Sequence, residues 1–564
     1  MNDSSYIKIL NKTIMKIQLS IKKTTIFIVC FLSFTIGFSQ SLESKIDDLL
    51  NSSYKTNEPG ATALVARNGE VIYRKAFGNS NLELDVEMIP ENVFEIGSIT
   101  KQFTAVSILM LLEQGKLSLD DEITKFLPEY PTHGKTITIH HLLTHTSGIK
   151  SYTNMQSFGE VVRKDMTPIE MIDFFKNEPM EFDPGEKYNY NNSGFFILGY
   201  IIEHISGMTY TEFLQENIFN PLNMTSSYYG SHTKLIENRA SGYQENNGFA
   251  NAIYISLSLP YAAGSIMSNV DDMLKWQTAI NSNTLVKRET IKKAFTNYTL
   301  NNGEPINYGY GWSRNDLNGI PSIEHGGGIP GYTTMGIYVP SEDVYVIILT
   351  NCGCNSPSGV ATKIAALAIN KPYPTATNVS NLTQKQLEKW TGAYKFENDA
   401  IRVVSLKDGQ LYSQRDEGEV YKIYPKNENE FYFEEGVIQY KFSMKDGKKT
   451  ALFKNRINVS EGIETIYEAP AEKEVITVDA EILKLYVGKY ELQPGFIIEI
   501  TSEGNQLFAQ ATGQPQSELF ATSTSSFFLK VTVASVDFIS NENDEIVSLT
   551  LHQGGQDMEA AKIE

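Results

Sequence analysis

The sequence predicts an α/β (α+β) domain of helices packed on an antiparallel sheet, followed by two all-β modules built as barrels or sandwiches. Helix and strand patterns alternate up to residue 370, residues 371–382 form a linker that opens on Lys-Pro-Tyr-Pro, and the remainder is rich in strands and turn signals. A chain of 564 residues is too long for one ordinary domain. With 41% hydrophobic and 20% charged residues, the composition is globular and excludes a disordered or fibrous protein.

The N-terminus has the pattern of a secretory signal peptide. Basic residues within Ser20–Lys23 precede the apolar run Thr24–Phe38, which is shorter than the roughly 20 residues that a membrane-spanning helix needs. We therefore expect residues 1–40 to be removed and the mature protein to be periplasmic or secreted, without a membrane attachment. A single uncleaved anchor is the alternative, and either Met1 or Met15 is the true start.

Three segments open the first domain, residues 41–370. Apolar residues at helical spacing predict an amphipathic helix over Ser41–Ser53. Apolar positions alternate across Ala61–Phe77 around an Asn-Gly pair at 68–69, which is a strong hairpin signal. Helical spacing returns over Ser98–Gln114, so a second helix is expected there.

The rest of this domain has patterns typical of helices, followed by patterns typical of two strands near its end. Thr167 and Glu170 have the spacing of a capping box and predict a helix start. Phe195–Ile205 is a buried-helix candidate, and Tyr332–Val339 and Val344–Thr350 read as two strands joined by a short turn. Strands on both sides of a helical block indicate a sheet with helices packed on it.

After the linker the chain repeats itself at an offset of 96 residues. The two copies define module 1 over residues 383–470 and module 2 over residues 479–564. The matching pairs are Leu387 and Leu483, Trp390 and Tyr486, Gly392 and Gly488, Tyr394 and Tyr490, Leu411 and Leu507, Gln414 and Gln510, Phe431 and Phe527, and Phe442 and Phe538.

Charge and cysteine content narrow the function classes. A net charge of -19 repels phosphate backbones and anionic lipid, so we expect no nucleic-acid partner. After residue 40 the only cysteines are Cys352 and Cys354, and the single residue between them disfavours an unstrained bridge, so we expect free thiols or at most a labile pair. No histidines and carboxylates have convincing metal spacing, and we assign no metal or cofactor.

The first candidate motif is Ser98-Ile-Thr-Lys101, which follows a short strand and opens an apolar helix. Residues three apart share a helix face, so the Lys101 amine can reach the Ser98 hydroxyl. A helix N-terminus also favours negative charge on that oxygen. The same spacing occurs elsewhere in the chain, and the alternative here is an N-cap serine beside a solvated lysine.

Two further motifs fit the same chemistry. Tyr190 and Asn192 place a phenol and an amide on one side of a loop, and a nearby lysine would make the phenol easier to deprotonate, as a base for serine requires. His325 and Gly327 belong to a glycine-rich strand start against which a substrate backbone could lie. An aromatic loop and a glycine-rich hairpin corner are the structural alternatives.

Together these motifs resemble the serine β-lactamase and penicillin-binding family, in its class C β-lactamase-like branch. That branch also holds D-alanyl-D-alanine carboxypeptidases, D-aminopeptidases and esterases. The resemblance covers about residues 42–370. Further phrases that carry it are HHLLTHTSGI at His140–Ile149, NPLNM at Asn220–Met224, AAGSIMS at Ala262–Ser268, YGYGW at Tyr308–Trp312 and LTN at Leu349–Asn351.

The resemblance implies a role for each residue of the motifs. Ser98 would be the acylated nucleophile, with Lys101 and Tyr190 as the proton-transfer pair. Asn192 would bind the substrate amide, and the backbone N–H groups of Ser98 and Gly328 would form the oxyanion hole. The catalytic domain followed by two β modules also resembles bacterial D-aminopeptidases.

The chain departs from the family pattern at His325, where many members have the lysine of a Lys-Thr-Gly motif. A histidine is largely neutral near pH 7, so it offers a substrate carboxylate less than a lysine does. We therefore expect an esterase, a D-aminopeptidase or a D-Ala-D-Ala carboxypeptidase-like enzyme acting on a small molecule or on cell-wall peptides. A true β-lactamase and a non-catalytic penicillin- or peptidoglycan-binding protein are the alternatives.

Overall fold

The computed structural model describes residues 41–564 except 246, 355, 377–378, 398, 417, 467–473, 494–495, 513 and 554–555. The predicted signal segment, residues 1–40, lies outside the described residues. The chain divides into two compact units, Met1–Ser53 and Tyr54–Glu564. The predicted helix at the start of the first domain is α2 (Leu42–Ser53), which buries Ile46 and Leu50. All the elements below belong to the second unit.

A six-stranded antiparallel sheet forms the centre of the first domain, in the order β10-β11-β12-β13-β1-β2. The N-terminal hairpin therefore pairs with a strand from the far end of the domain, through β1 and β13. The strands are β1 (Ala61–Arg67), β2 (Glu70–Phe77), β10 (Ser313–Leu317), β11 (Ile320–Ile329), β12 (Tyr332–Val339) and β13 (Val344–Thr350).

The turn residues account for the hairpins of this sheet. Asn68 and Gly69 both have positive φ, 53° and 76°, as the predicted two-residue turn requires. The strands predicted over Tyr332–Val339 and Val344–Thr350 occur with those bounds. The predicted fold class, helices on an antiparallel sheet, is confirmed.

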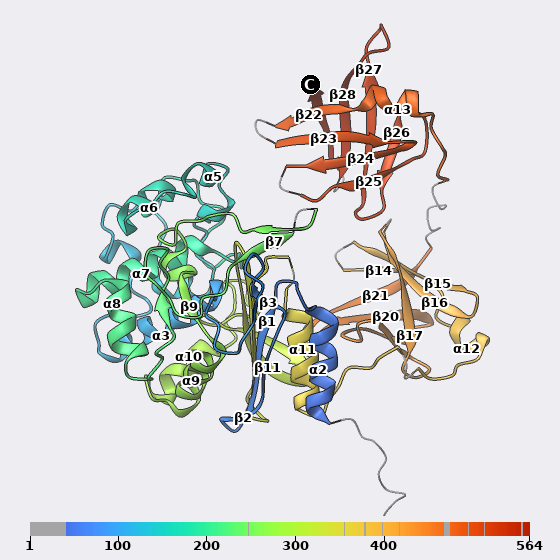
Figure 1. Ribbon diagram of the computed structural model, residues 1–564. Coiled ribbons are helices and arrows are strands. Elements are labelled where there is room, and N and C mark those ends of the chain that lie inside the picture. The colour runs from blue at the N-terminus through green and yellow to red at the C-terminus, as the bar shows by residue number, and fades with distance from the viewer. Residues whose placement is uncertain are drawn as a thin grey trace, which may run out of the picture. The chain divides into compact units, whose positions relative to one another are not determined.

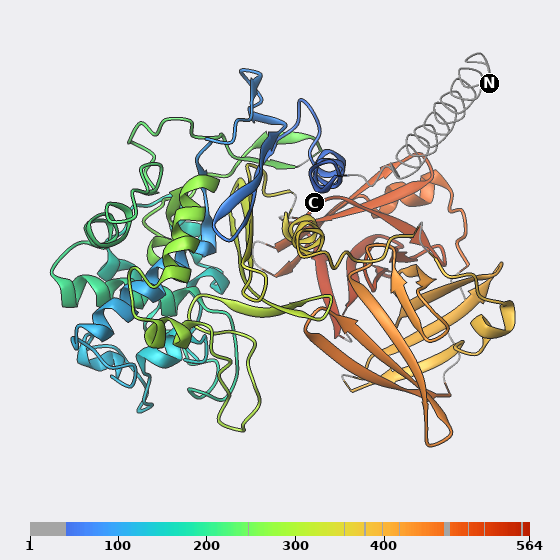
Figure 2. The ribbon, with the colours of Figure 1, turned by 90° about the horizontal axis from the view of Figure 1, so that it is seen from below.

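Helices cover both faces of the sheet, which explains why β1 and β13 are buried along almost their whole length. Helix α11 (Ser358–Ala368) packs on β12 and β13, and α9 (Val270–Ser282) packs on β1 and β13 from the other side (Figures 1 and 2). Smaller sheets join β3 (Asn79–Asn81) with β4 (Val86–Glu87), β5 (Phe94–Glu95) with β9 (Ile266–Ser268) and β6 (Tyr228–Tyr229), and β7 (Tyr243–Glu245) with β8 (Phe249–Asn251).

Two buried helices position the candidate site. Helix α3 (Thr100–Glu113) packs against α7 (Asn192–Ser206) in the core, and Phe103 of α3 stacks on Trp276 with ring centroids 3.9 Å apart. Helix α6 (Pro168–Phe175) begins at the predicted capping box of Thr167 and Glu170. The other helical segments are η1 (Gly97–Ile99), η2 (Ile123–Lys125), α4 (Ile139–Leu143), η3 (Tyr152–Asn154), α5 (Phe158–Val161), α8 (Tyr210–Leu214), η4 (Gln215–Phe219), η5 (Tyr261–Ala263) and α10 (Arg288–Ala294).

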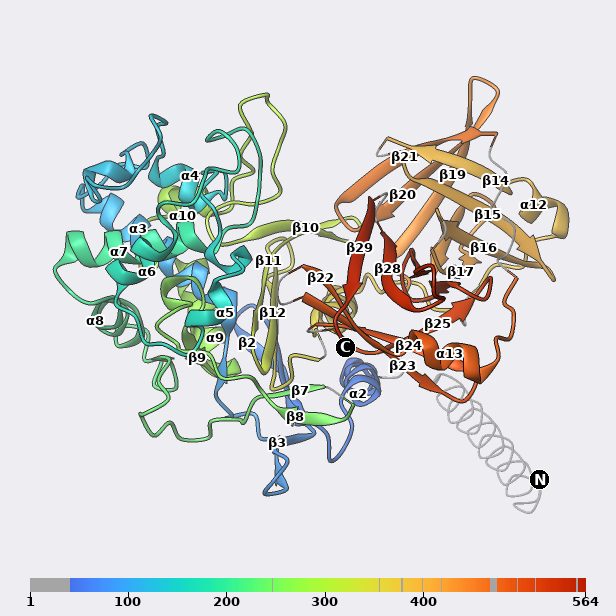
Figure 3. The ribbon, with the colours of Figure 1, turned by 90° about the horizontal axis from the view of Figure 1, so that it is seen from above.

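The two repeats form two closed eight-stranded barrels, each preceded by a short helix, α12 (Gln384–Glu388) or α13 (Ala480–Tyr486) (Figure 3). The first contains β14 (Gly392–Phe396), β15 (Ile401–Lys407), β16 (Gln410–Arg415), β17 (Val420–Pro425), β18 (Glu430–Phe433), β19 (Ile438–Lys445), β20 (Lys448–Asn455) and β21 (Asn458–Thr465). The second contains β22 (Gly488–Gln493), β23 (Phe496–Glu503), β24 (Gln506–Ala511), β25 (Ser517–Ala521), β26 (Ser526–Leu529), β27 (Ala534–Ser540), β28 (Ile546–Gln553) and β29 (Gln556–Lys562).

Matching residues of the two barrels make matching contacts. Trp390 stacks on Phe442 in the first barrel, as Tyr486 stacks on Phe538 in the second. The Tyr394 hydroxyl donates to the Trp390 carbonyl at 2.7 Å, and its counterpart 96 residues on repeats the bond at 2.7 Å. The sequence repeat is therefore a structural repeat.

One hairpin of the first barrel contacts the sheet of the first domain. Arg456, in the turn between β20 and β21, donates from Nη1 and Nη2 to the two carboxylate oxygens of Glu324 at 2.8 and 2.7 Å. Its Nε donates to the Asp316 carbonyl at 3.0 Å. Both side chains of the ion pair are at most 10% exposed. The barrel is thus attached to β11, the strand that also carries His325.

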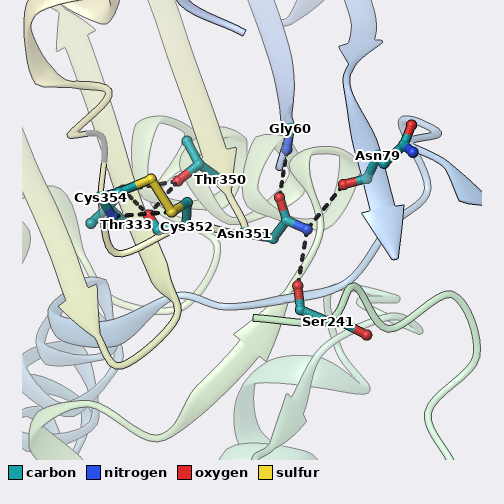
Figure 4. The surroundings of a disulfide bond; sticks show 8 residues. All are labelled: Gly60, Asn79, Ser241, Thr333, Thr350, Asn351, Cys352 and Cys354. Atoms are coloured by element: carbon teal, nitrogen blue, oxygen red, sulfur yellow. Dashed lines mark hydrogen bonds between the residues drawn. A yellow bond between two sulfur atoms is a disulfide. The ribbon is translucent and has the colours of Figure 1, made fainter. Parts of the chain in front are cut away.

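The two cysteines correct a prediction, because Cys352 and Cys354 form a disulfide (Figure 4). The chain turns sharply after β13, so their Cα atoms lie 5.1 Å apart, within the range that a bridge needs. The prediction of free thiols assumed that one intervening residue holds the pair in a less compatible geometry.

Within the described part of the chain, no helix combines the length and the apolar character needed to cross a membrane.

Candidate active site

Ser98 lies where a short strand turns into a helix. After β5, Gly97 adopts a φ of +53°, which a residue with a side chain rarely adopts, and the turn η1 leads into α3. Ser98 is partly exposed although its neighbours Gly97 and Ile99 are buried. The predicted helix start is therefore correct to within a residue or two, and it presents the Ser98 hydroxyl at the helix N-terminus.

Lys101 is fully buried one turn further along and contacts the candidate nucleophile. Its Nζ lies 3.1 Å from Ser98 Oγ, 2.8 Å from Asn192 Oδ1 and 2.9 Å from the Ala263 carbonyl oxygen. It also lies 4.7 Å from the centre of the Tyr190 ring. The structure thus brings four of the residues singled out from the sequence into one contact set.

The partners of Lys101 fit a neutral amine. A neutral amine has two N–H donors and one lone pair, and the two carbonyl oxygens, of Asn192 and Ala263, take the two donors. The remaining partner, Ser98, has a hydroxyl that can donate to the lone pair. Burial, with no carboxylate partner among the described residues, also lowers the pKa of Lys101 well below its usual range.

The pKa of Tyr190 shifts in the direction opposite to the prediction. The prediction was that the lysine would ease deprotonation of its phenol, but burial raises the pKa of Tyr190 above its usual range, and the nearby Ser98 hydroxyl opposes this only in part. The Tyr190 hydroxyl is buried and makes no hydrogen bond of standard geometry within the described residues. It is therefore a protonated phenol, able to donate to a group that enters beside Ser98.

Asn192 is held by hydrogen bonds at both ends of its amide. Its Oδ1 accepts from Lys101, its Nδ2 donates to Thr153 Oγ1 at 3.1 Å, and its backbone N–H donates to Ser151 Oγ at 3.2 Å. The preceding residue, Asn191, caps α7 by accepting from the Gly194 N–H at 2.8 Å. The start of α7 thus fixes the amide beside the lysine.

His325 is buried on β11 and neutral. Its Nε2 lies 2.9 Å from the Tyr308 hydroxyl, and its Nδ1 lies 2.6 Å from the Gly326 carbonyl oxygen. The carbonyl requires an N–H at Nδ1, so Nε2 accepts from the phenol. Burial lowers the pKa of His325 to about 4, and protonation of Lys101 would lower it in the same direction. The prediction that this position carries no cation near pH 7 agrees with that environment.

The glycines of β11 bring its backbone against Ser98. A Cβ added to Gly97 would lie 2.8 Å from the Gly328 nitrogen, and one added to Gly327 would clash with the Ile96 carbonyl oxygen. The Thr334 hydroxyl donates to that carbonyl at 3.0 Å. Gly328 is exposed, so its backbone borders the open side of the site.

Sequence reasoning assigned no role to two residues of this site. The ring of His145 lies 4.3 Å from that of Tyr190 and 4.7 Å from that of Tyr308 between centroids, and its Nδ1 accepts from the Asn191 N–H at 3.0 Å. His145 therefore belongs to the candidate site. Both His145 and Tyr308 occur in family-like phrases, which was the signal available.

A cleft of about 840 Å³ lies beside this cluster. Tyr188, whose ring contacts His145 and Tyr308, lines it together with charged residues of both signs, among them Glu304 and Arg314. Ile457, next to Arg456 in the barrel hairpin, completes one wall. The lining of the cleft does not include Ser98, Lys101 or Tyr190, and the cleft borders the site through Tyr188.

The chain is similar to known proteins in both sequence and fold. The family model described as Beta-lactamase matches residues 42–371, and a domain of unknown function, DUF3471, matches residues 472–562. A penicillin-binding protein of Bacillus subtilis (strain 168) is 25% identical over 549 residues, which cover 93% of this chain and 99% of the relative. A D-aminopeptidase of Gluconobacter oxydans (strain 621H) is 27% identical over 345 residues, 60% of this chain and 63% of the relative. The solved structure of an octameric penicillin-binding protein homologue from Pyrococcus abyssi superposes with a TM-score of 0.52 at 28% identity, over 75% of this chain and 99% of that one.

Proposed function

Because the chain belongs to the Beta-lactamase family, we propose that it is a secreted or periplasmic serine hydrolase that cleaves an ester or amide bond through an acyl-enzyme on Ser98. The observation that carries the proposal is the contact of Lys101 Nζ with Ser98 Oγ at 3.1 Å, while its other two partners are acceptors. A buried amine so placed takes the serine proton as a general base.

The first half of the reaction transfers the acyl group to the serine. The Ser98 hydroxyl gives its proton to Lys101 Nζ as Oγ attacks the carbonyl carbon of the substrate. The developing oxyanion is stabilised by the backbone N–H groups of Ser98 and Gly328. These two residues lie close together because Gly97, next to Ser98, packs against the backbone of Gly328. An oxyanion donor contributes about 10²–10³-fold to turnover.

Tyr190 donates the proton to the leaving group. Its phenol is protonated, faces Ser98 and lies above the lysine, so it donates to the departing oxygen or nitrogen and is reprotonated from Lys101. Water then attacks the acyl-enzyme with the same groups acting in reverse, and the acid and free Ser98 are released. Asn192 orients both Lys101 and the substrate amide.

The environment of His325 bears on the substrate. A buried, neutral imidazole with both nitrogens engaged offers no charge to a carboxylate beside the scissile bond. This favours esters and peptides, as in a D-aminopeptidase or a D-Ala-D-Ala carboxypeptidase-like enzyme, over a true β-lactamase.

The signal-peptide pattern before residue 41 and the Cys352–Cys354 disulfide support the proposed location, because disulfides persist in oxidising compartments outside the cytosol.

A penicillin-binding protein that is acylated but turns over slowly is the second candidate. It is favoured by the similarity to a penicillin-binding protein over 93% of this chain. In that case penicillin would label Ser98 and the label would persist, whereas a hydrolase would release it.

The test is intact-mass analysis after a fluorophosphonate or a penicillin, followed by rates on p-nitrophenyl esters, D-Ala-D-Ala peptides and nitrocefin. One adduct is expected, absent in Ser98→Ala and retained in Ser231→Ala, a matched control whose serine also precedes a lysine by three residues but lies on a loop. Labelling that survives in Ser98→Ala would overturn the proposal.

A further inference from the structure

The Cys352–Cys354 disulfide is exposed on one side only. Cys352 is 3% exposed and Cys354 lies at the surface. Displacement at a disulfide requires the attacking sulfur to approach along the S–S axis, from behind the sulfur that it joins. Because Cys354 is the exposed residue of the pair, a thiolate from solvent meets its sulfur more readily than the sulfur of Cys352.

The buried sulfur has a donor ready for the charge that it would acquire. The backbone N–H of Cys354 points at Cys352 Sγ at 3.2 Å. A hydrogen bond to a thiolate stabilises it and makes that sulfur the better leaving group. The two sulfurs thus differ in both access and electrostatics.

The backbone around the bridge is held by other bonds. The Cys352 carbonyl accepts from the hydroxyls of Thr333 at 3.0 Å and Thr350 at 3.3 Å (Figure 4). The amide of Asn351 bridges the Gly60 N–H at 2.6 Å and the Ser241 carbonyl at 2.9 Å. Since the bridge itself closes only a three-residue loop, it removes little entropy from the unfolded chain, and the fold does not depend on it.

We propose that this pair is a thiol–disulfide exchange site, modified at Cys354 by a low-molecular-weight thiol. The incoming thiolate forms a bond to Cys354 Sγ, the Cys352–Cys354 bond breaks, and its electron pair leaves on Cys352 as a thiolate bound by the Cys354 N–H. The reverse attack of Cys352 on the mixed disulfide expels the small thiol and restores the bridge. No oxidant is consumed in either direction.

Reduced glutathione and the full chain provide the test. After acid quenching, alkylation and tryptic digestion, mass spectrometry should find glutathione on Cys354 and the alkyl group on Cys352, while tryptophan fluorescence stays native. The peptide between Arg314 and Lys363 holds both cysteines and no other. Glutathione on Cys352, or opening only when the protein unfolds, would overturn the proposal.

Two matched variants test the asymmetry separately. The free Cys354 of Cys352→Ser should react with a maleimide about tenfold or more faster than the buried Cys352 of Cys354→Ser, and equal rates would count against the site. If neither variant folds, the mass-spectrometric position of glutathione in the unaltered chain still tests the proposal. Ser98→Ala should exchange like the unaltered protein, so a failure here is distinguishable from a failure of the proposed hydrolysis.

Discussion

Arg456 of the first barrel forms a bidentate, buried ion pair with Glu324, the residue that precedes His325 on β11. Successive side chains of a strand point to opposite faces, so the barrel holds β11 from the side opposite to His325. This contact ties the position of the strand that carries His325 and Gly328 to the presence of the barrel.

Arg456→Met should therefore destabilise the first domain and lower kcat. Removing the arginine leaves the Glu324 carboxylate buried without its partner, which costs about 3–5 kcal/mol for a buried pair. The double variant Glu324→Gln with Arg456→Met should recover much of the stability, because no unpaired charge remains. Urea unfolding of the three proteins measures this.

The control is Lys454→Met, on the same hairpin, whose ion pair with Asp316 is partly exposed. Such a pair contributes about 0–1 kcal/mol, so the variant should behave almost like the unaltered protein. If Arg456→Met and Lys454→Met lower the free energy of unfolding equally, the buried ion pair contributes no more to stability than the exposed one.

The pH dependence of kcat/KM should identify the base. The pKa of Lys101 is lowered by burial, so kcat/KM should fall as decreasing pH protonates the amine that accepts the serine proton. The pKa of Tyr190 is raised, so no rise should appear on the alkaline side up to the usual tyrosine pKa of about 10. His325→Gln should show the same loss of kcat/KM at low pH if that loss is caused by protonation of Lys101. A rate that climbs through the alkaline range would instead indicate a phenolate base.

Lys101→Ala and Tyr190→Phe should each reduce kcat by about 10²–10⁴-fold, the usual worth of general acid–base catalysis, with less effect on substrate binding. Because one proton passes between the two groups, the double variant should be little worse than either single variant. Single-turnover acylation rates measure all three. Losses that multiply would mean that the two residues act independently.

His325→Lys should shift preference towards substrates with a carboxylate beside the scissile bond. The change places a cation where a neutral imidazole now accepts from Tyr308, and a charge-assisted contact contributes about 1–3 kcal/mol. The readout is the ratio of kcat/KM for one ester and one β-lactam, with His325→Gln as the uncharged control. If the ratio is unchanged while Ser98 stays reactive, position 325 does not recognise the carboxylate.

Acid should destabilise the first domain through the half-buried His140. Burial lowers the pKa of His140 to about 4, below the unfolded value of about 6.5, so its contribution to stability is complete above the unfolded value and is lost as pH falls from about 6.5 towards 4. His140→Gln should reduce the slope of unfolding free energy against pH by at most about 1.4 kcal/mol per unit. Urea unfolding followed by Trp276 and Trp312 fluorescence, in a Trp390→Phe background, measures it. A slope unchanged by the substitution would contradict the assignment.

Local patterns predicted the elements well because they act over a few residues. The Asn-Gly pair at 68–69 and the capping box at Thr167 determine a turn and a helix start by themselves. The repeat predicted two β modules, but closure of each into a barrel depends on pairing between first and last strands, as of β14 with β21, which no local signal carries.

The candidate site was predictable in part. Ser98 and Lys101 share a helix, so their contact follows from spacing. The protonation of Tyr190 and the place of His145 depend on what buries them, and those neighbours come from distant segments. Cys352 and Cys354 were misjudged for a related reason, since the turn after β13 that brings them together is set by contacts with Thr333 and Tyr243.

The position of β1 in the sheet, between β2 and β13, has a consequence for the time course of synthesis. The Gly60 N–H donates to the side chain of Asn351, which follows 291 residues later, and β1 pairs along its whole length with β13. The first hairpin to leave the ribosome therefore has no partner on one side until almost the whole domain has been translated. Pairing between segments so distant in sequence is slow. The first domain therefore completes its central sheet only late in synthesis, which fits the export proposed for this chain.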